Sequence, residues 1–350
     1  MLIRRLKKFP NRIYNFFKSH LKYYRALYSF KLIKGPKYIN LKKDEIVCII
    51  LFRDMGYYLE YFYKYYRSIG VNYFICVDNG STDDSISIVS KWENTILLKS
   101  ELNFKHYQRE LRQIATTRYC SDGWRLAVDP DEILEYFGSK KISLQTLIGD
   151  LEKNKFTGVV AYMLDMIPEN KLSEISKTTF EESIKRNVFY SLDDIYSYGY
   201  YDKDCPIHGI IKNNKLNYEN VEWKFGGIRK KYFGEECCLT KHPIFYYKNG
   251  VIPFVHPHLT TGLSLADFTV VLKHYKFSGT YIEREKKLID DDRIFHDETR
   301  KRSSIINDGK SFSFKMNDFE DNSSIEYLID RGFVGISDRA ISFYKKNSEK

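Results

Sequence analysis

The stretch EIVCIILF, Glu45–Phe52, decides the fold of this chain. After Glu45 it is apolar throughout, and several of its residues are β-branched. A short apolar run without polar alternation is typical of a strand that is buried on both faces of a parallel sheet. We therefore predict such a strand here, and we expect the sheet to begin with it.

The segment after this strand, MGYYLEYFYKYYRSIG, has the spacing of a helix. Apolar side chains recur every three or four residues, and Gly70 is placed to cap the C-terminus. The predicted buried face consists of Met55, Tyr58, Leu59, Phe62, Tyr66 and Ile69. A buried strand is thus followed by a helix that packs on it.

The same alternation continues along the chain. Further strands are predicted at YFICVD (Tyr73–Asp78), TILLKS (Thr95–Ser100) and WRLAV (Trp124–Val128), with a helix over Phe104–Tyr119. Strands and helices in this rhythm predict an α/β fold, in which a mostly parallel sheet is covered by helices on both faces. Ligands of such sheets bind beyond the carboxyl ends of the strands.

Composition fits a folded protein in a reducing compartment. The 350 residues are 43% hydrophobic and 16% aromatic, which suffices for a core. The six cysteines form no CxxC pair. No run of about 18 apolar residues is present, and the N-terminus lacks the apolar core of a secretion signal. We expect a cytoplasmic protein.

Positive charge is concentrated at one end of the chain. Residues 1–43 contain 13 Lys and Arg and no Asp or Glu, whereas the remainder holds 43 basic and 46 acidic residues. Apolar residues recur between these charges at helical spacing: Leu2, Leu6, Phe9, Ile13, Phe16, Phe17, Leu21, Tyr24 and Leu27. This pattern predicts a helix on an anionic membrane surface. The alternative is a docking helix with a solvated basic face; nucleic acid is not favoured, because the excess stops at residue 43.

Two acidic turns follow predicted strands, DNGSTDD after the second and DPDE after the fourth. Adjacent carboxylates repel one another and resist burial, so a cation that neutralises them is expected. Asp129 and Asp131 can offer oxygens to one hard divalent ion, Mg²⁺ or Mn²⁺. The alternative is an exposed acidic turn without a ligand.

The stretches Leu51–Ser85 and Trp124–Leu134 resemble the glycosyltransferase family-two-like group of bacterial enzymes, which have a GT-A nucleotide-diphospho-sugar-binding fold. The resemblance extends more loosely over residues 45–335. The sequence departs from the family pattern in the turn after the first strand, where Asp54 and Met55 replace the usual Asn and Glu.

The resemblance implies a site for a nucleotide sugar. Asp78 corresponds to the acidic contact of the nucleotide base, although ordinary turn chemistry also explains this residue. Asp129 and Asp131 correspond to the metal-binding pair, and His258 is a candidate third ligand. The candidate nucleotide-sugar-binding residues are Arg53, Asp78, Asn79, Ser81 and Arg109. His242 and His274, which also lie in the second half of the chain, are assigned structural roles.

The implied reaction is displacement at the anomeric carbon of a sugar, in which the metal stabilises the departing nucleotide diphosphate. A carboxylate from the second half of the chain is then needed as the base that activates the acceptor hydroxyl. Glu222 is the first candidate, followed by Asp204 and Asp202.

We therefore expect a metal-dependent, inverting hexosyltransferase, peripheral to the inner face of the plasma membrane. Its donor would be a UDP-hexose and its acceptor a glycan or lipid-linked glycan of capsule or lipopolysaccharide synthesis. Three parts are predicted: a basic N-terminal helix region (1–43), a GT-A domain (44–298) and a C-terminal linker with a docking extension (299–350). The alternatives are a sugar-phosphate nucleotidyltransferase and a non-catalytic adaptor with a nucleotide-binding fold.

Overall fold

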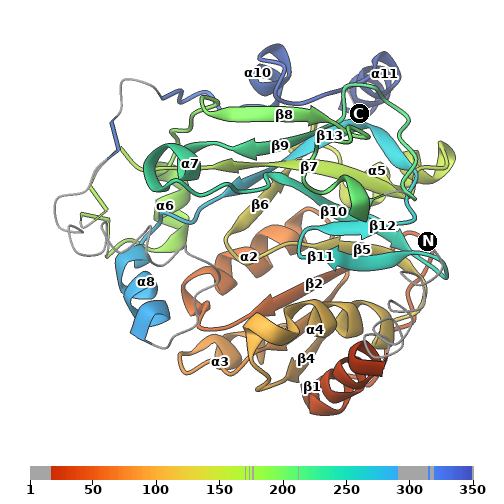
Figure 1. Ribbon diagram of the computed structural model, residues 1–350, viewed down its shortest axis with the longest axis vertical. Coiled ribbons are helices and arrows are strands. Elements are labelled where there is room, and N and C mark those ends of the chain that lie inside the picture. Colours follow the sequence, from red (N-terminus) through yellow and green to blue (C-terminus); the bar gives the residue numbers. More distant parts are fainter. Residues whose placement is uncertain are drawn as a thin grey trace, which may run out of the picture.

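The computed structural model describes residues 17–290, 314–315 and 319–348, except positions 170, 173, 176 and 212. Its centre is a nine-stranded sheet with the strand order β1-β4-β3-β2-β5-β10-β7-β13-β6 (Figure 1). In that order the strands are β1 (Lys31–Lys34), β4 (Thr95–Lys99), β3 (Tyr73–Asp78), β2 (Ile46–Phe52), β5 (Gly123–Ala127), β10 (Thr240–Tyr247), β7 (Gly158–Asp165), β13 (Leu265–His274) and β6 (Glu132–Glu135).

The strand directions confirm the predicted fold class. Strands β4, β3, β2 and β5 are mutually parallel, and β10 inserts antiparallel between β5 and β7. Strands β7 and β13 again run with β2, whereas the edge strands β1 and β6 run the opposite way. The sheet is thus large and mostly parallel, with antiparallel strands in its second half and at its edges.

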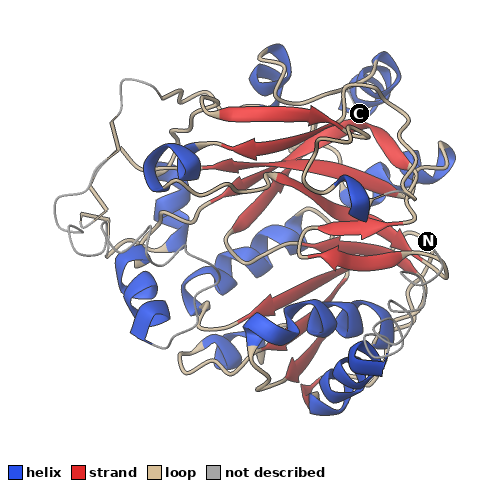
Figure 2. Cartoon of the chain, in the orientation of Figure 1, coloured by secondary structure: helices blue, strands red, loops and turns tan. Residues whose placement is uncertain are grey.

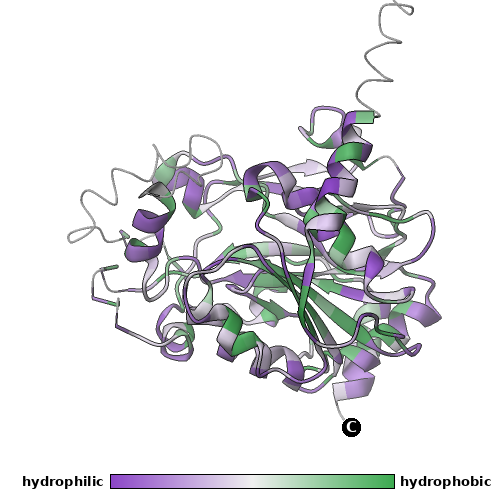
Figure 3. Ribbon diagram, turned by 90° about the horizontal axis from the view of Figure 1, so that it is seen from below, coloured by the Kyte–Doolittle hydropathy of each residue, from purple (hydrophilic) through white to green (hydrophobic). Residues whose placement is uncertain are grey.

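Helices lie on both faces of the sheet (Figure 2). Alternate residues of β2 pack against the helices on opposite faces. Ile46, Cys48 and Ile50 face one layer, and Val47 and Ile49 face the other. The first layer consists of α2 (Gly56–Ser68), α3 (Ser85–Val89), α5 (Leu144–Lys153) and α11 (Asp338–Ser348). The second consists of α4 (Phe104–Arg118) and a helix at residues 17–29. Figure 3 shows the strands as the most hydrophobic part of the molecule, with polar residues on the surrounding helices.

The second half of the sheet is covered by shorter elements. Two small antiparallel sheets, β8–β9 (Ile195–Gly199 and Glu222–Gly226) and β11–β12 (Ile252–His256 and Leu259–Thr261), contribute to the core cluster over β7 and β13. The remaining elements are α6 (Phe180–Arg186), a 3₁₀ turn (His208–Ile210), α7 (Ile228–Phe233), α8 (Tyr281–Asp290) and α10 (Ile325–Asp330). This half brings residues far apart in the sequence to the carboxyl end of β5.

The N-terminal region is part of the fold, contrary to one prediction. We expected no strand before Glu45, but β1 pairs with the edge strand β4, and Ala26 of the preceding helix is fully buried against the sheet. The apolar positions from Leu2 to Phe16 lie outside the described residues. Within the described residues, every helix is too short or too polar to span a bilayer.

At the other end of the chain, the helix α10 lies within the segment that we predicted as a docking extension. It packs into the core cluster over β7 and β13 through Ile325 and Leu328. The polar stretch after Thr299 falls largely outside the described residues. The helix α11, which was not predicted, buries Ala340 and Tyr344 in the main core.

Candidate active site

A pocket of about 580 Å³ lies where the chain reverses its direction across the sheet. From β2 the chain moves outward to β3 and β4, and then returns to place β5 on the other side of β2. The loops after β2 and β5 therefore diverge, which leaves a crevice at the carboxyl ends of these strands. Arg53 follows β2, and Asp129, Asp131 and Glu132 follow β5; all four line the pocket.

The lining combines residues from both halves of the chain. The helix α4 contributes Lys105, Gln108 and Arg112, on consecutive turns of one face. The part of the chain after β6 contributes Met163, Arg229, Lys241, His258, His274, Lys276 and Leu288. Among the described lining residues, six are Lys or Arg and four are Asp or Glu, so the pocket carries a positive excess.

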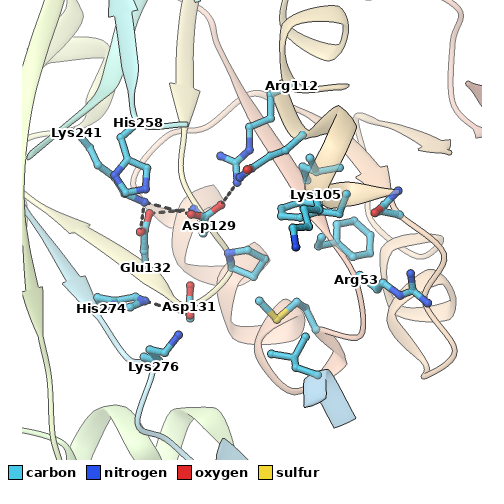
Figure 4. Close-up of a pocket in the computed structure, with 18 of the residues that line it drawn as sticks. Arg53, Lys105, Arg112, Asp129, Asp131, Glu132, Lys241, His258, His274 and Lys276 are labelled. Atoms are coloured by element: carbon cyan, nitrogen blue, oxygen red, sulfur yellow. Dashed lines mark hydrogen bonds and ion pairs between the residues drawn. The ribbon is translucent and has the colours of Figure 1, made fainter. Parts of the chain in front are cut away.

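Asp129 is held between two cations (Figure 4). Its Oδ1 accepts a hydrogen bond from Arg112 Nη2 at 2.7 Å, and its Oδ2 accepts one from Lys241 Nζ at 3.1 Å. Lys241 also donates to Glu132, which is fully buried. Burial alone raises the pKa of Asp129, but Arg112 and Lys241 outweigh it and hold this pKa far below its usual range. The carboxylate is therefore ionised and already paired within the protein.

Asp131 is the second carboxylate of the turn, and it contacts a histidine. Its Oδ2 lies 3.3 Å from Nε2 of His274, whose Nδ1 is 2.5 Å from Asp165 Oδ1. Within the described part of the chain, Oδ1 of Asp131 forms no hydrogen bond or ion pair. Burial opposes ionisation of Asp131, but the nearby His274 lowers its pKa overall. Asp131 thus combines one fixed oxygen with one that remains available in the pocket lining.

His258 has the properties of a neutral imidazole ligand. Its Nδ1 is buried and has no hydrogen-bond partner among the described residues. Burial, reinforced by the charge of Lys241, lowers its pKa well below the usual value, so the ring is neutral. A metal ion requires this form of histidine.

These donors fit a divalent ion in chemistry, although they are not arranged as a metal centre. Asp131 offers a carboxylate oxygen and His258 an imidazole nitrogen, but both oxygens of Asp129 are occupied by Arg112 and Lys241. In the described residues, no three His, Cys, Asp or Glu side chains are grouped so that they can hold a metal. Asp129 would have to exchange its protein cations for the ion.

Two of the predicted nucleotide-sugar-binding residues, Arg53 and Asn79, line the pocket. The amide nitrogen of Asn79 donates to the carbonyls of Ser100 and Leu102 at 2.7 and 2.8 Å, which fixes its orientation. Its Oδ1 is buried and has no hydrogen-bond partner in the part of the chain described. Such an acceptor suits an N–H or O–H group of a ligand.

Asp78 and Ser81 are not among the described residues that line the pocket. The carboxylate of Asp78 is fully buried and accepts the backbone N–H groups of Gly80 and Ser81, both at 3.0 Å. The hydroxyl of Ser81 accepts the N–H of Asp54 at 2.9 Å. These contacts are turn chemistry, and the base contact of Asp78 stays a prediction.

Arg109 is not among the described residues that line the pocket, whereas Arg112 of the same helix is. Arg109 is exposed on α4, whereas Arg112 is buried against Asp129. The helical period alone does not separate them, because Arg109 lies four residues and Arg112 seven residues after Lys105, and both spacings return to nearly the same side of the helix.

The predicted bases lie outside the pocket lining. Glu222 begins β9, where its Oε2 accepts a hydrogen bond from Lys224 at 3.0 Å. Asp204 is exposed, and its backbone N–H donates to Asp202. The structure does not bring these carboxylates to Asp129 and Asp131.

His274 and Lys241 are pocket residues that the sequence pattern does not identify. We assigned His274 a structural role, but it lines the pocket and contacts Asp131. Lys241 is the lone lysine of the largely buried strand β10, TKHPIFYY. A charged residue inside a buried strand is a weak signal for a buried partner, and here the partner is Glu132.

Comparisons with known proteins leave the chain without an assigned family. No family model and no curated protein matches it. Among solved structures, S. aureus TarS is 17% identical over 38% of this chain and 24% of that chain, with a TM-score of 0.30. A 4-diphosphocytidyl-2C-methyl-D-erythritol synthase is 11% identical over 40% and 67%, with a TM-score of 0.24. The chain thus spans about a quarter of TarS, and likenesses this slight carry no argument about activity.

Proposed function

We propose that this chain is a glycosyltransferase of the GT-A type, which moves a hexose from a nucleotide-diphosphate donor to a glycan or lipid-linked acceptor. One observation carries the proposal: the acidic turn Asp129–Glu132 lies in a pocket at the point where the strand order reverses, and the lining of that pocket is rich in cations. Ligands bind at this position in open α/β sheets.

The cations of the pocket suit a diphosphate. Arg53 and Lys105 lie toward one side of the pocket, with Arg112 above them in Figure 4. Guanidinium groups bind phosphate oxygens through paired hydrogen bonds, and ammonium groups bind them as point charges. The fixed, unpaired Oδ1 of Asn79 can accept a hydrogen bond from the ribose or base of the same donor.

Asp131 and His258 would hold a Mg²⁺ or Mn²⁺ ion, together with Asp129 once its cations are released. The bound ion would neutralise the charge that develops on the departing diphosphate. Arg112 and Lys241, when they leave Asp129, are free to bind the phosphate oxygens of the donor instead. Glu222 and Asp204 remain predicted bases, although an acceptor would have to extend beyond the pocket lining to meet them.

A membrane-bound acceptor is supported by the helix at residues 17–29. One face of this helix packs on the sheet through Ala26, and Lys22 forms an ion pair with Glu110 of α4 at 3.0 Å. A second face is exposed: Phe17, Leu21, Tyr24 and Tyr28 are 65, 72, 49 and 82% exposed. Apolar side chains at this spacing, among basic residues without acidic ones, complement an anionic lipid surface.

Point substitutions test the membrane proposal, because removal of residues 1–40 would also remove β1. The double variant Leu21→Ser and Tyr28→Ser should lose most of its binding to vesicles of anionic lipid and keep its melting temperature. Ile252→Ser, on an exposed position of β11, is the matched control. Equal sedimentation of all three proteins with vesicles would withdraw the membrane proposal.

The function is tested with a panel of nucleotide sugars in the presence of Mn²⁺. Release of nucleoside diphosphate that depends on one donor would support the transferase. Release of pyrophosphate from a nucleoside triphosphate and a sugar phosphate would instead identify a nucleotidyltransferase. Binding of nucleotides without turnover of any donor would favour the adaptor.

A further inference from the structure

We propose that His274 is a positioning residue, which fixes the carboxylate of Asp131 in the pocket and is itself fixed from behind by Asp165 and Arg229. The inference rests on the proposed function, because it concerns the same site. It assigns a role to three residues that follow the acidic turn in the sequence, Asp165, Arg229 and His274, and that no sequence motif connects with that turn.

The side chains of Arg229, Asp165, His274 and Asp131 form a continuous series of contacts. Arg229 Nε donates to Asp165 Oδ2 at 2.9 Å, and Asp165 Oδ1 lies 2.5 Å from His274 Nδ1. The other ring nitrogen of His274, Nε2, lies 3.3 Å from Asp131 Oδ2. All four residues contribute side chains that are largely buried. This series of contacts ends at Asp131, in the lining of the pocket.

Regular secondary structure fixes the two middle residues of this series of contacts, His274 and Asp165. His274 is the last residue of β13, and the parallel strand β7 places Asp165 directly beside it in register. On its other side, the antiparallel strand β6 places Glu132 opposite His274. The imidazole is therefore mounted on a rigid sheet rather than on a loop, which limits its freedom of orientation.

Asp131, in contrast, belongs to the turn between β5 and β6 and has few supports of its own. Its backbone carbonyl accepts the N–H of Tyr275 at 2.8 Å, which ties the turn to the residue after His274. Its side chain contacts His274 through Oδ2. The imidazole thus selects one orientation of the carboxylate and leaves Oδ1 available in the pocket.

The geometry on both sides of the ring agrees with this role. Each ring nitrogen of His274 faces a carboxylate oxygen: Nδ1 faces that of Asp165, and Nε2 faces that of Asp131. A ring held between two carboxylates in this way limits the orientation of both of them. Partners of this kind, behind the residues that contact a ligand, typically change affinity or activity by about 10- to 100-fold when removed.

A pair of substitutions separates positioning of Asp131 from support of the sheet. In His274→Gln the side-chain amide can reach the position of Nε2 and keep the contact with Asp131. In His274→Asn the amide replaces Nδ1 and keeps only the contact with Asp165. His242→Gln is the matched control, since His242 is also a buried histidine of the sheet but contacts Thr260 and Tyr200 instead of the site.

The kcat and KM for donor turnover and the melting temperature are measured for each folded variant. We expect His274→Asn to lower kcat about 10- to 100-fold, with the KM for the donor within about threefold of the intact protein. His274→Gln should recover much of that loss, Asp165→Asn, which leaves His274 in contact with Asp131, should lower kcat less than His274→Asn does, and His242→Gln should keep the kcat of the intact protein.

Two results would overturn the proposal. If His274→Asn retains more turnover than His274→Gln, the contact with Asp165 matters and the role is structural. If both retain full turnover, Asp131 needs no positioning by His274. An intact protein that turns over no donor would mean that the proposed function itself has failed, and this inference with it.

Discussion

The two acidic turns of this molecule look alike in sequence but have different partners in the structure. In the turn after β3, the carboxylates accept backbone N–H groups close by: Asp78 binds those of Gly80 and Ser81, and Asp83 binds that of Ser85. In the turn after β5, Asp129 and Asp131 instead contact charged side chains. The first turn is complete without a ligand.

The second turn depends on groups that the fold brings from elsewhere. Arg112 comes from the preceding helix, but Lys241 and His274 lie more than 100 residues further along the chain. A carboxylate that is paired with a side chain from another element can exchange that partner for a bound ion or ligand, whereas a carboxylate that is bonded to the backbone of its own turn cannot do so without unfolding the turn. This difference is why we assign the proposed site to the second turn.

The largest effect is expected for Asp131→Asn. If the second turn carries the chemistry, this change should lower turnover by about 10³-fold, which corresponds to about 4 kcal/mol in the barrier, because the neutral amide no longer attracts the ion. Asp83→Asn in the first turn is the control and should keep turnover. Steady-state kinetics at saturating donor and Mn²⁺ measure both. Full turnover by Asp131→Asn, or in excess chelator, would contradict the metal role.

This contrast also explains what the sequence could predict. The runs Ile46–Phe52 and Tyr73–Asp78 are confirmed as strands because local apolar pattern determines them. The position of the pocket followed from the order of strands and helices. The partners Lys241 and His274 could not be predicted, because they depend on how β10 and β13 enter the sheet. The edge strand β1, at KLIK, is too short and too basic to give a strand signal.

The next largest effect is expected on stability, for Lys241→Met. This change removes the cation from the fully buried Glu132 and should lower the free energy of unfolding by about 3 kcal/mol, the lower end for a broken buried pair, since Arg112 still holds Asp129. Urea denaturation measures the loss. The double variant Lys241→Met and Glu132→Gln should recover part of it; a double variant no more stable than the single one would show that lost packing, rather than unpaired charge, is responsible.

A smaller loss of about 2 kcal/mol is expected for Asp78→Ala, because two buried backbone N–H groups lose a charged acceptor. The same variant tests the base contact implied by the family resemblance. If Asp78 also binds the nucleotide base, the affinity for donor should fall by about 1–3 kcal/mol. Calorimetric titration of the folded variant with UDP decides between the two roles, and unchanged affinity would leave Asp78 with turn chemistry alone.

The smallest effect is expected for Lys287→Ala, which tests the link between α8 and the loop before α2. Lys287 Nζ lies 3.0 Å from Asp54 Oδ2 and 2.7 Å from the hydroxyl of Thr82, but its side chain is 44% exposed. Such pairs contribute at most about 0.5–1 kcal/mol to stability and are weakened by salt.

The pH dependence of that effect follows from Asp54. Burial tends to raise the pKa of Asp54, but the backbone N–H of Thr82 and the side chain of Lys287 outweigh it and lower this pKa. A lowered carboxyl pKa contributes stability that is present above the unfolded-state value of about 3.9 and is lost as the pH falls through the folded-state value. The difference in melting temperature between the intact protein and Lys287→Ala should therefore be small at pH 7 and vanish in acid. A difference that persists after Asp54 is protonated would show that Lys287 acts through Thr82 instead, and that the first turn also depends on a side chain brought from the second half of the chain.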